Sequence, residues 1–116
     1  MLILHDAPGG LSKLSLTEIQ SIIEKYNTWR GKLAASGKLV GGHKLMDEGG
    51  KALSKTAERL TVLDGPYSET KEIVGGYFII RASSYDNAVQ LASDCPHLSY
   101  GRIQLRKIDF LGHPET

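Results

Sequence analysis

The longest helical pattern in the chain reads SLTEIQSIIEKYNTWRGKLAASG and begins at Ser15. Ser15 and Glu18 have the spacing of a capping box, in which each side chain bonds the backbone N–H of the other residue. Apolar residues recur at every third or fourth position through the stretch, so one stripe would pack against a core. Gly37 closes the stretch, at a position where glycine commonly ends a helix. The pattern predicts one long amphipathic helix.

Strand patterns lie on both sides of this helix. Short apolar or alternating runs predict strands at 2–4, 38–45, 52–56, 59–63, 74–82 and 102–109. The two short runs at 52–56 and 59–63 would form a hairpin or excursion. The pair Gly41-Gly42 would weaken or bulge the strand that contains it.

A second helix is predicted to begin at Ser83 or Ser84 and to end before Pro96, which cannot continue it. Its buried face would be formed by Ala88, Val89, Leu91 and Ala92. Two helices separated by strands predict an α+β fold of the ferredoxin-like, split βαβ type, with both helices on one face of an antiparallel sheet. We expect the other face to be covered by a second subunit in a twofold homodimer.

Length and charge exclude several classes of protein. The 116 residues suit a single domain, 1–116, and the net formal charge of +1 argues against a nucleic-acid partner. The apolar run at 2–4 is too short for a signal peptide or a membrane span, so we expect a cytoplasmic protein without a membrane partner. The one cysteine, Cys95, cannot form an internal disulfide and is expected to be a structural thiol.

The densest polar segment is DGPYSETKE, residues 64–72. Asp64, Glu69, Lys71 and Glu72 are the candidate catalytic groups, because a desolvated carboxyl group beside an ionised one can divide the roles of acid and base. The alternative is a structural turn, in which Asp64 bonds backbone amides and Glu69 and Lys71 form a modest exposed pair. Composition alone favours the turn.

Further candidates come from two glycine pairs and from the aromatic residues. Glycine inside a strand indicates a bulge, or a place where the backbone approaches a ligand or a partner closely. The candidate ligand-binding residues are Gly42, Tyr67, Gly75 and Gly76. Tyr26 and His43 are added as catalytic candidates, the latter because it follows a glycine pair. The histidines lack the spacing of a metal site, and we expect neither a metal nor an organic cofactor.

The segment at 64–72, followed by Gly75-Gly76-Tyr77, resembles the motif D-G-P-F-x-E-x-K-E-x-x-G-G-[FY] of the DGPF group of YciI-like (YCII-related) proteins. The resemblance covers essentially the whole chain and implies a ferredoxin-like, dimeric α+β barrel. Most members of the group have no established reaction, and some occur beside sigma factors of the extracytoplasmic-function type.

Related YciI-like proteins include a dehydrochlorinase, in whose branch a histidine–aspartate pair is the proposed acid–base machinery. The position on the first helix that holds this histidine is occupied here by Tyr26. A phenol, with an ordinary pKa of about 10, is a poor base at neutral pH. The resemblance therefore does not transfer the histidine mechanism, and Tyr67 in place of phenylalanine is a milder departure.

Two functions remain open from the sequence. The first is a dimeric module that binds a small ligand or acts in regulation, with the charged segment as architecture. The alternative is a cofactor-independent acid–base enzyme, similar to a lyase or an isomerase, that uses the carboxylate-rich loop. The enzyme would require the candidate side chains to converge on a cavity of at least about 300 Å³.

Overall fold

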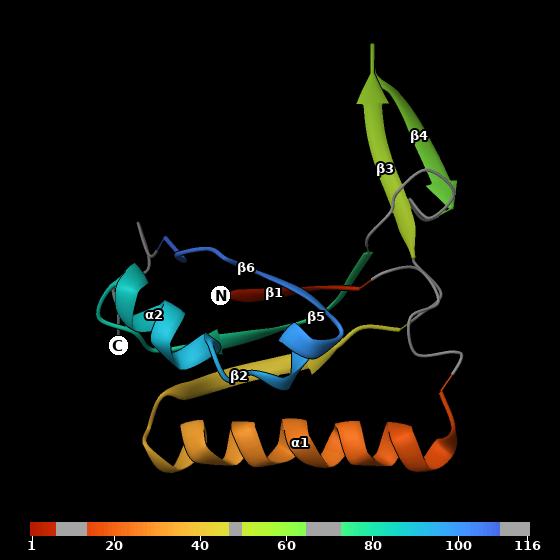
Figure 1. The fold of residues 1–116 in the computed structure, drawn as a ribbon. Coiled ribbons are helices and arrows are strands. Elements are labelled where there is room, and N and C mark those ends of the chain that lie inside the picture. Colours follow the sequence, from red (N-terminus) through yellow and green to blue (C-terminus); the bar gives the residue numbers. More distant parts are fainter. Residues whose placement is uncertain (7–13, 47–49, 65–72, 110–116) are drawn as a thin grey trace.

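The computed structural model describes residues 1–6, 14–46, 50–64 and 73–109. Its elements, labelled in Figure 1, are β1 (Leu2–Asp6), α1 (Leu16–Ala35), β2 (Leu39–Lys44), β3 (Lys51–Thr56), β4 (Arg59–Asp64), β5 (Ile73–Ile80), α2 (Tyr85–Ala92), the 3₁₀ helix η2 (Pro96–Ser99) and β6 (Gly101–Leu105). This order confirms the predicted alternation of strands and helices.

The main sheet has four antiparallel strands in the order β2-β5-β1-β6. The first strand of the chain therefore lies inside the sheet, between β5 and β6. Leaving aside the β3–β4 hairpin, the strand order is that of a ferredoxin-like split βαβ fold. The fold class is α+β, as predicted.

Both helices pack on one face of this sheet. Strand residues Leu2, Leu4 and Phe78 form one buried cluster with Trp29 and Leu33 of α1. The cluster continues through Ala92 and Cys95 at the end of α2. The Trp29 ring meets the Phe78 ring edge-on, with 5.1 Å between the centroids, and its N–H donates to the carbonyl of Leu91 at 3.3 Å. The core thus joins the sheet to both helices.

The hairpin of β3 and β4 is a separate two-stranded sheet that projects away from the helices and the main sheet (Figure 1). All residues of its two strands are exposed. Ala57 and Glu58 connect the strands in a left-handed backbone conformation. The predicted hairpin is confirmed, and it stands outside the core.

Local signals predicted the ends of α1 well. Both hydrogen bonds of the capping box are present, from the N–H of Glu18 to Ser15 Oγ at 3.1 Å and from the N–H of Ser15 to Glu18 Oε1 at 3.3 Å. Gly37 follows the last turn with φ +73°, a conformation that favours glycine. The register of β2 shifts between Leu39 and Gly41, which confirms the predicted bulge.

Three predictions about buried residues were wrong, and one of them concerns Ile23 on the apolar stripe of α1, which is 52% exposed. Val89, expected on the buried face of α2, is 54% exposed, because the short α2 contributes only Ala92 fully to the core. Leu16, placed on the apolar stripe of α1, is 81% exposed, since it is the first residue of the helix and lies beyond the sheet. The last strand also ends earlier than expected, at Leu105 instead of residue 109.

Cys95 is a buried core residue, with 3% of its surface exposed. Burial raises the pKa of its thiol, which disfavours the reactive thiolate. These properties agree with the expected structural role. Within the described ranges, no helix is long and apolar enough to cross a membrane.

Candidate functional site

A cavity of about 430 Å³ lies between α1 and the main sheet, and we call it the helix–sheet cavity. One face of α1 forms its roof through Ile19, Ile22, Ile23, Tyr26, Asn27 and Arg30. These positions follow the three- and four-residue spacing of the apolar stripe, so the amphipathic pattern itself directs them to the sheet. The floor is formed by Leu4, Asp6, Gly42, His43, Lys44, Gly75, Gly76 and Phe78, and His97 and Tyr100 close one side.

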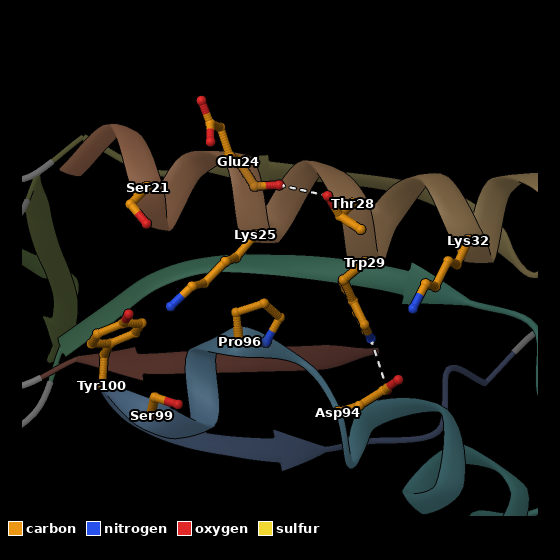
Figure 2. A pocket seen from close by; sticks show the side chains of 10 residues that line it. All are labelled: Ser21, Glu24, Lys25, Thr28, Trp29, Lys32, Asp94, Pro96, Ser99 and Tyr100. Carbon is orange, nitrogen blue, oxygen red and sulfur yellow. Dashed lines mark hydrogen bonds between the residues drawn. The ribbon is translucent and has the colours of Figure 1, made fainter. Parts of the chain in front are cut away.

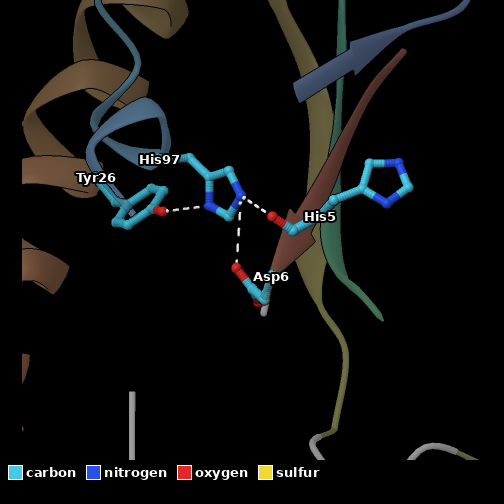
Figure 3. A network of polar contacts seen from close by, with 4 residues as sticks. All are labelled: His5, Asp6, Tyr26 and His97. Carbon is cyan, nitrogen blue, oxygen red and sulfur yellow. Dashed lines mark hydrogen bonds and ion pairs between the residues drawn. The ribbon is translucent and has the colours of Figure 1, made fainter. Parts of the chain in front are cut away.

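A buried histidine at the wall of this cavity joins three elements of the fold (Figure 3). His97, on η2, is only 3% exposed. Its Nδ1 lies 2.8 Å from the hydroxyl of Tyr26 on α1, and its Nε2 lies 2.9 Å from the carbonyl oxygen of His5 on β1. Asp6, the next residue of β1, places Oδ1 at 3.5 Å from Nε2.

The partners of His97 determine the tautomer of its neutral ring. The carbonyl of His5 can only accept a hydrogen bond, so Nε2 must carry the proton. Nδ1 is then unprotonated and accepts the proton of the Tyr26 hydroxyl. In this arrangement the Tyr26 oxygen keeps lone pairs that can accept from a bound molecule, and the Asp6 carboxylate lies beside the N–H of the imidazole.

Tyr26 is protonated in this setting. Burial raises the pKa of the Tyr26 hydroxyl well above its ordinary value, and repulsion from Cys95, when that thiol is ionised, and from the Asp6 carboxylate adds to the rise. A free tyrosinate is therefore disfavoured. Tyr26 can give up its proton only to a base in direct contact, and His97 is that base.

Two glycines leave the space that this arrangement needs. A Cβ atom at Gly75 would overlap Oδ2 of Asp6. A Cβ atom at Gly101, which lies opposite Asp6 in the β1–β6 ladder, would overlap the carbonyl oxygen of His5 and lie 2.8 Å from Nε2 of His97. Glycine at both positions therefore lets carboxylate, carbonyl and imidazole approach one another.

The predicted glycine positions in the described chain border the cavity. Gly42, Gly75 and Gly76 all line its floor. At Gly42 a Cβ atom would lie 2.7 Å from the carbonyl oxygen of Tyr77, and at Gly76 it would lie 2.9 Å from that of His43. These glycines thus allow close approach of the neighbouring strand as well as forming the floor.

His43 borders the cavity, but its ring is engaged elsewhere. His43 and Tyr77 are cross-strand partners, and the Tyr77 hydroxyl lies 2.8 Å from Nδ1 of His43. Side chains alternate along a strand, and the neighbouring Phe78 points into the core. The His43 and Tyr77 side chains therefore lie on the face of the sheet opposite the helices.

The carboxylate-rich segment is divided by the range that the structure describes. Asp64 is the last residue of β4, at the end of the exposed hairpin opposite the turn, where it forms an ion pair with its cross-strand partner Lys51. It lines neither described cavity. Tyr67, Glu69, Lys71 and Glu72 lie outside the described residues.

A second hollow, of about 590 Å³, lies on the other side of α1 and is shown in Figure 2; we call it the surface groove. Exposed residues such as Glu24, Lys25 and Lys32 form most of its lining. At its base, the N–H of Trp29 donates to Asp94 Oδ1 at 3.2 Å. The polar groups at the base are thus bonded to each other, and the lysines extend into solvent.

The sequence analysis missed Asp6, His97 and Arg30 as members of the site. Asp6 and His97 are 91 positions apart in the chain, so no local spacing connects them. The sequence did contain one relevant signal, the two strand patterns that become β1 and β6. Their antiparallel pairing brings Asp6 opposite Gly101, close to η2. In the described part of the chain, no group of three or more His, Cys, Asp or Glu side chains could hold a metal ion.

Comparison with known proteins agrees with this architecture. The family model of the YCII-related domain matches residues 1–109. An uncharacterized protein of Rhizobium meliloti (strain 1021) is 31% identical over 84 residues, which cover 72% of this chain and 68% of that protein. The chain therefore belongs to the YCII-related family. The relative from Rhizobium meliloti is itself uncharacterized and indicates no activity.

Alanine at Gly101 is expected to destabilise the protein, because its Cβ would collide with backbone and displace His97. We expect Gly101→Ala to lower the free energy of unfolding by about 1–3 kcal/mol, as overpacking typically does. Gly41→Ala is the matched control in β2, the strand at the opposite edge of the same sheet, since nothing lies within 4 Å of its added Cβ. That variant should stay within about 0.5 kcal/mol of the native protein in urea denaturation. Equal stabilities of the two variants would contradict the proposed close approach.

Proposed function

We propose that this YCII-related protein binds a small molecule in the helix–sheet cavity. The observation that carries the proposal is the meeting of apolar walls with the Tyr26 hydroxyl and the Asp6 carboxylate in one cavity of about 430 Å³. Binding sites for small molecules typically have this size, with mainly apolar walls and a few polar groups that fix the orientation of the ligand. The surface groove has no such combination, because its lining is mostly exposed and polar.

A second candidate function, acid–base catalysis on the bound molecule, is favoured by the contacts of His97. A base must lie within hydrogen-bond reach of the proton that it takes, and His97 Nδ1 meets this condition for Tyr26 at 2.8 Å. As Tyr26 Oη takes a proton from a C–H group of the ligand, its own proton would pass to Nδ1. The electron pair of the broken C–H bond would stay on the ligand as an enolate.

The charge on His97 that this transfer creates has a partner in place. The protonated ring would keep its Nε2–H toward His5 and Asp6, and the Asp6 carboxylate at 3.5 Å would stabilise the imidazolium. This arrangement follows the logic of an aspartate that orients a histidine and stabilises its charged form. The return of the proton to a different carbon of the ligand would complete an isomerisation. In an elimination the enolate electron pair would form a double bond as a β-substituent departs with its bonding electrons, and the imidazolium would return the proton through Tyr26 to that leaving group.

Ligand binding is tested by filling the cavity. Ile23 lines the helix–sheet cavity and is 52% exposed, so Ile23→Trp can occupy the cavity without disturbing the core. We expect compounds from a fragment library that stabilise the native protein against heat to lose this effect in Ile23→Trp. A compound present at 100 times its dissociation constant should stabilise the folded protein by about 2.7 kcal/mol.

Val89→Trp is the control for this experiment, because Val89 is equally exposed, at 54%, but lies on α2 outside the cavity. The control should retain stabilisation by the same compounds. Stabilisation that survives in Ile23→Trp would place the binding site elsewhere and contradict the proposal.

Proton transfer is tested with 2-tetralone, a neutral ketone with an apolar body and acidic α-protons. In D₂O the native protein should accelerate the exchange of these protons, followed by NMR, and Tyr26→Phe should reduce the acceleration by about 100-fold or more. Tyr100→Phe is the control, since Tyr100 lines the same cavity without contacting His97 through its hydroxyl in the described network. No acceleration, or equal acceleration by Tyr26→Phe, would argue against catalysis.

We also propose a homodimer formed through the helix-free face of the main sheet. Neither α1 nor α2 packs on that face, and strand alternation places Ile3, Tyr77 and Ile79 there, opposite the core residues Leu2 and Phe78. The two isoleucines share this face with the polar side chains of His43 and Tyr77, and a second copy related by twofold symmetry would cover them.

Sedimentation measurements test the dimer. The native protein should sediment with the mass of two chains, and Ile79→Arg should shift it to the monomer, because the arginine would be buried unpaired at the centre of the interface. Val89→Arg, on the other side of the molecule, should remain dimeric. A native protein that sediments as a monomer at high concentration would contradict the proposed interface.

A further inference from the structure

Arg30 is the one arginine that lines the helix–sheet cavity, and the network of His97 does not use it. It lies on α1 one turn beyond Tyr26, and residues four apart share one face of a helix. The carbon at the centre of its guanidinium lies 5.6 Å from the centroid of the Phe78 ring. Arg30 therefore presents a cation over the apolar floor of the cavity.

One buried donor of Arg30 has no partner among the described residues. Its Nε is buried and has no hydrogen-bond partner among them. Buried polar groups in native proteins nearly always have partners, and a buried guanidinium donor without one indicates an acceptor that binds there. The guanidinium presents N–H donors in a planar fork that matches the two oxygens of a carboxylate.

We propose that the helix–sheet cavity selects small aromatic carboxylates and that Arg30 binds the carboxylate group. The inference rests on the proposed function, since it names the class of molecule that the cavity takes. Among the described lining residues, Arg30 and Lys44 carry positive charge and Asp6 is the one carboxylate. A singly charged anion fits this balance better than a doubly charged phosphate, which Asp6 would repel.

The positions of Arg30 and Tyr26 set the shape of the ligand. Four residues of helix separate them by about 6 Å along the axis. A flat ring with a carboxylate at one end and an oxygen at the other spans such a distance. The carboxylate would pair with Arg30, the ring would lie against Phe78 and Ile22, and the second oxygen would face the hydroxyl of Tyr26.

The probes for this proposal are 4-hydroxybenzoate and its neutral analogue 4-hydroxybenzamide, which share a ring and a phenol and differ in charge. In calorimetric titrations at neutral pH, the native protein should bind the acid at least tenfold more tightly than the amide. Arg30→Met removes the charge but keeps an unbranched apolar chain. It should abolish the preference for the acid, lowering the affinity for the amide far less than that for the acid, and a native-like unfolding curve in urea shows that the variant is folded. Arg30→Lys should restore part of the preference.

Lys25→Met is the matched control, because Lys25 lies on the same helix but lines the surface groove (Figure 2). It should leave both affinities unchanged. Equal binding of acid and amide by the native protein, or an unchanged preference in Arg30→Met, overturns the role of Arg30 but leaves the small-molecule site in place. Loss of binding in Lys25→Met alone, or no binding of either probe, overturns the assignment of the cavity to aromatic carboxylates. If Lys25→Met alone loses binding, the small-molecule site in the helix–sheet cavity is overturned as well.

Discussion

The buried imidazole of His97 is the constraint on which the candidate site depends. A polar ring that is 3% exposed must have both nitrogens hydrogen-bonded, because an unpaired buried polar group is costly. The two partners lie on different elements: the hydroxyl of Tyr26 on α1 and the carbonyl of His5 on β1. The same ring therefore fixes the distance between α1 and β1 and places Tyr26 at the wall of the cavity.

Placement of β1 inside the sheet makes this arrangement possible. Because β1 pairs with both β5 and β6, Asp6 has Gly75 close on one side and Gly101 opposite it on the other. Small residues on both flanking strands leave room for a carboxylate and an imidazole at the end of the strand. The topology of the fold thus assembles polar groups from the two ends of the chain at one edge of a mainly apolar cavity.

Much of the fold was predictable from local signals, since a capping box, a glycine that ends a helix and the alternation of a strand each involve residues that are close in the sequence. The ends of α1, the β3–β4 hairpin and the bulge in β2 were predicted in this way. The residues of the candidate site were harder to predict from the sequence. Gly42, Gly75 and Gly76 were named because they fall inside predicted strands, and Tyr26 because it occupies the helix position where related proteins hold a histidine; all four border the cavity.

His97 and Asp6 were not identified, because their proximity arises from tertiary packing and leaves no spacing in the sequence. The exposure of Val89 was missed for a related reason: a short helix satisfies its amphipathic pattern only where the rest of the fold meets it. Charge density, by contrast, directed attention to Asp64, which the structure places on a projecting hairpin with Lys51 as its partner. Asp64 therefore lies apart from the helix–sheet cavity, and the rest of that polar segment lies outside the described residues.

The nitrogen chemical shifts of the His97 ring, measured in a long-range ¹H–¹⁵N NMR spectrum at neutral pH, test the central claim most directly. The account predicts a neutral ring with its proton on Nε2, directed at the carbonyl of His5, and an unprotonated Nδ1 that accepts from Tyr26. In Tyr26→Phe the Nδ1 shift should move toward that of a nitrogen without a hydrogen bond. A proton on Nδ1, or shifts averaged between the two tautomers as in an exposed histidine, would contradict the account.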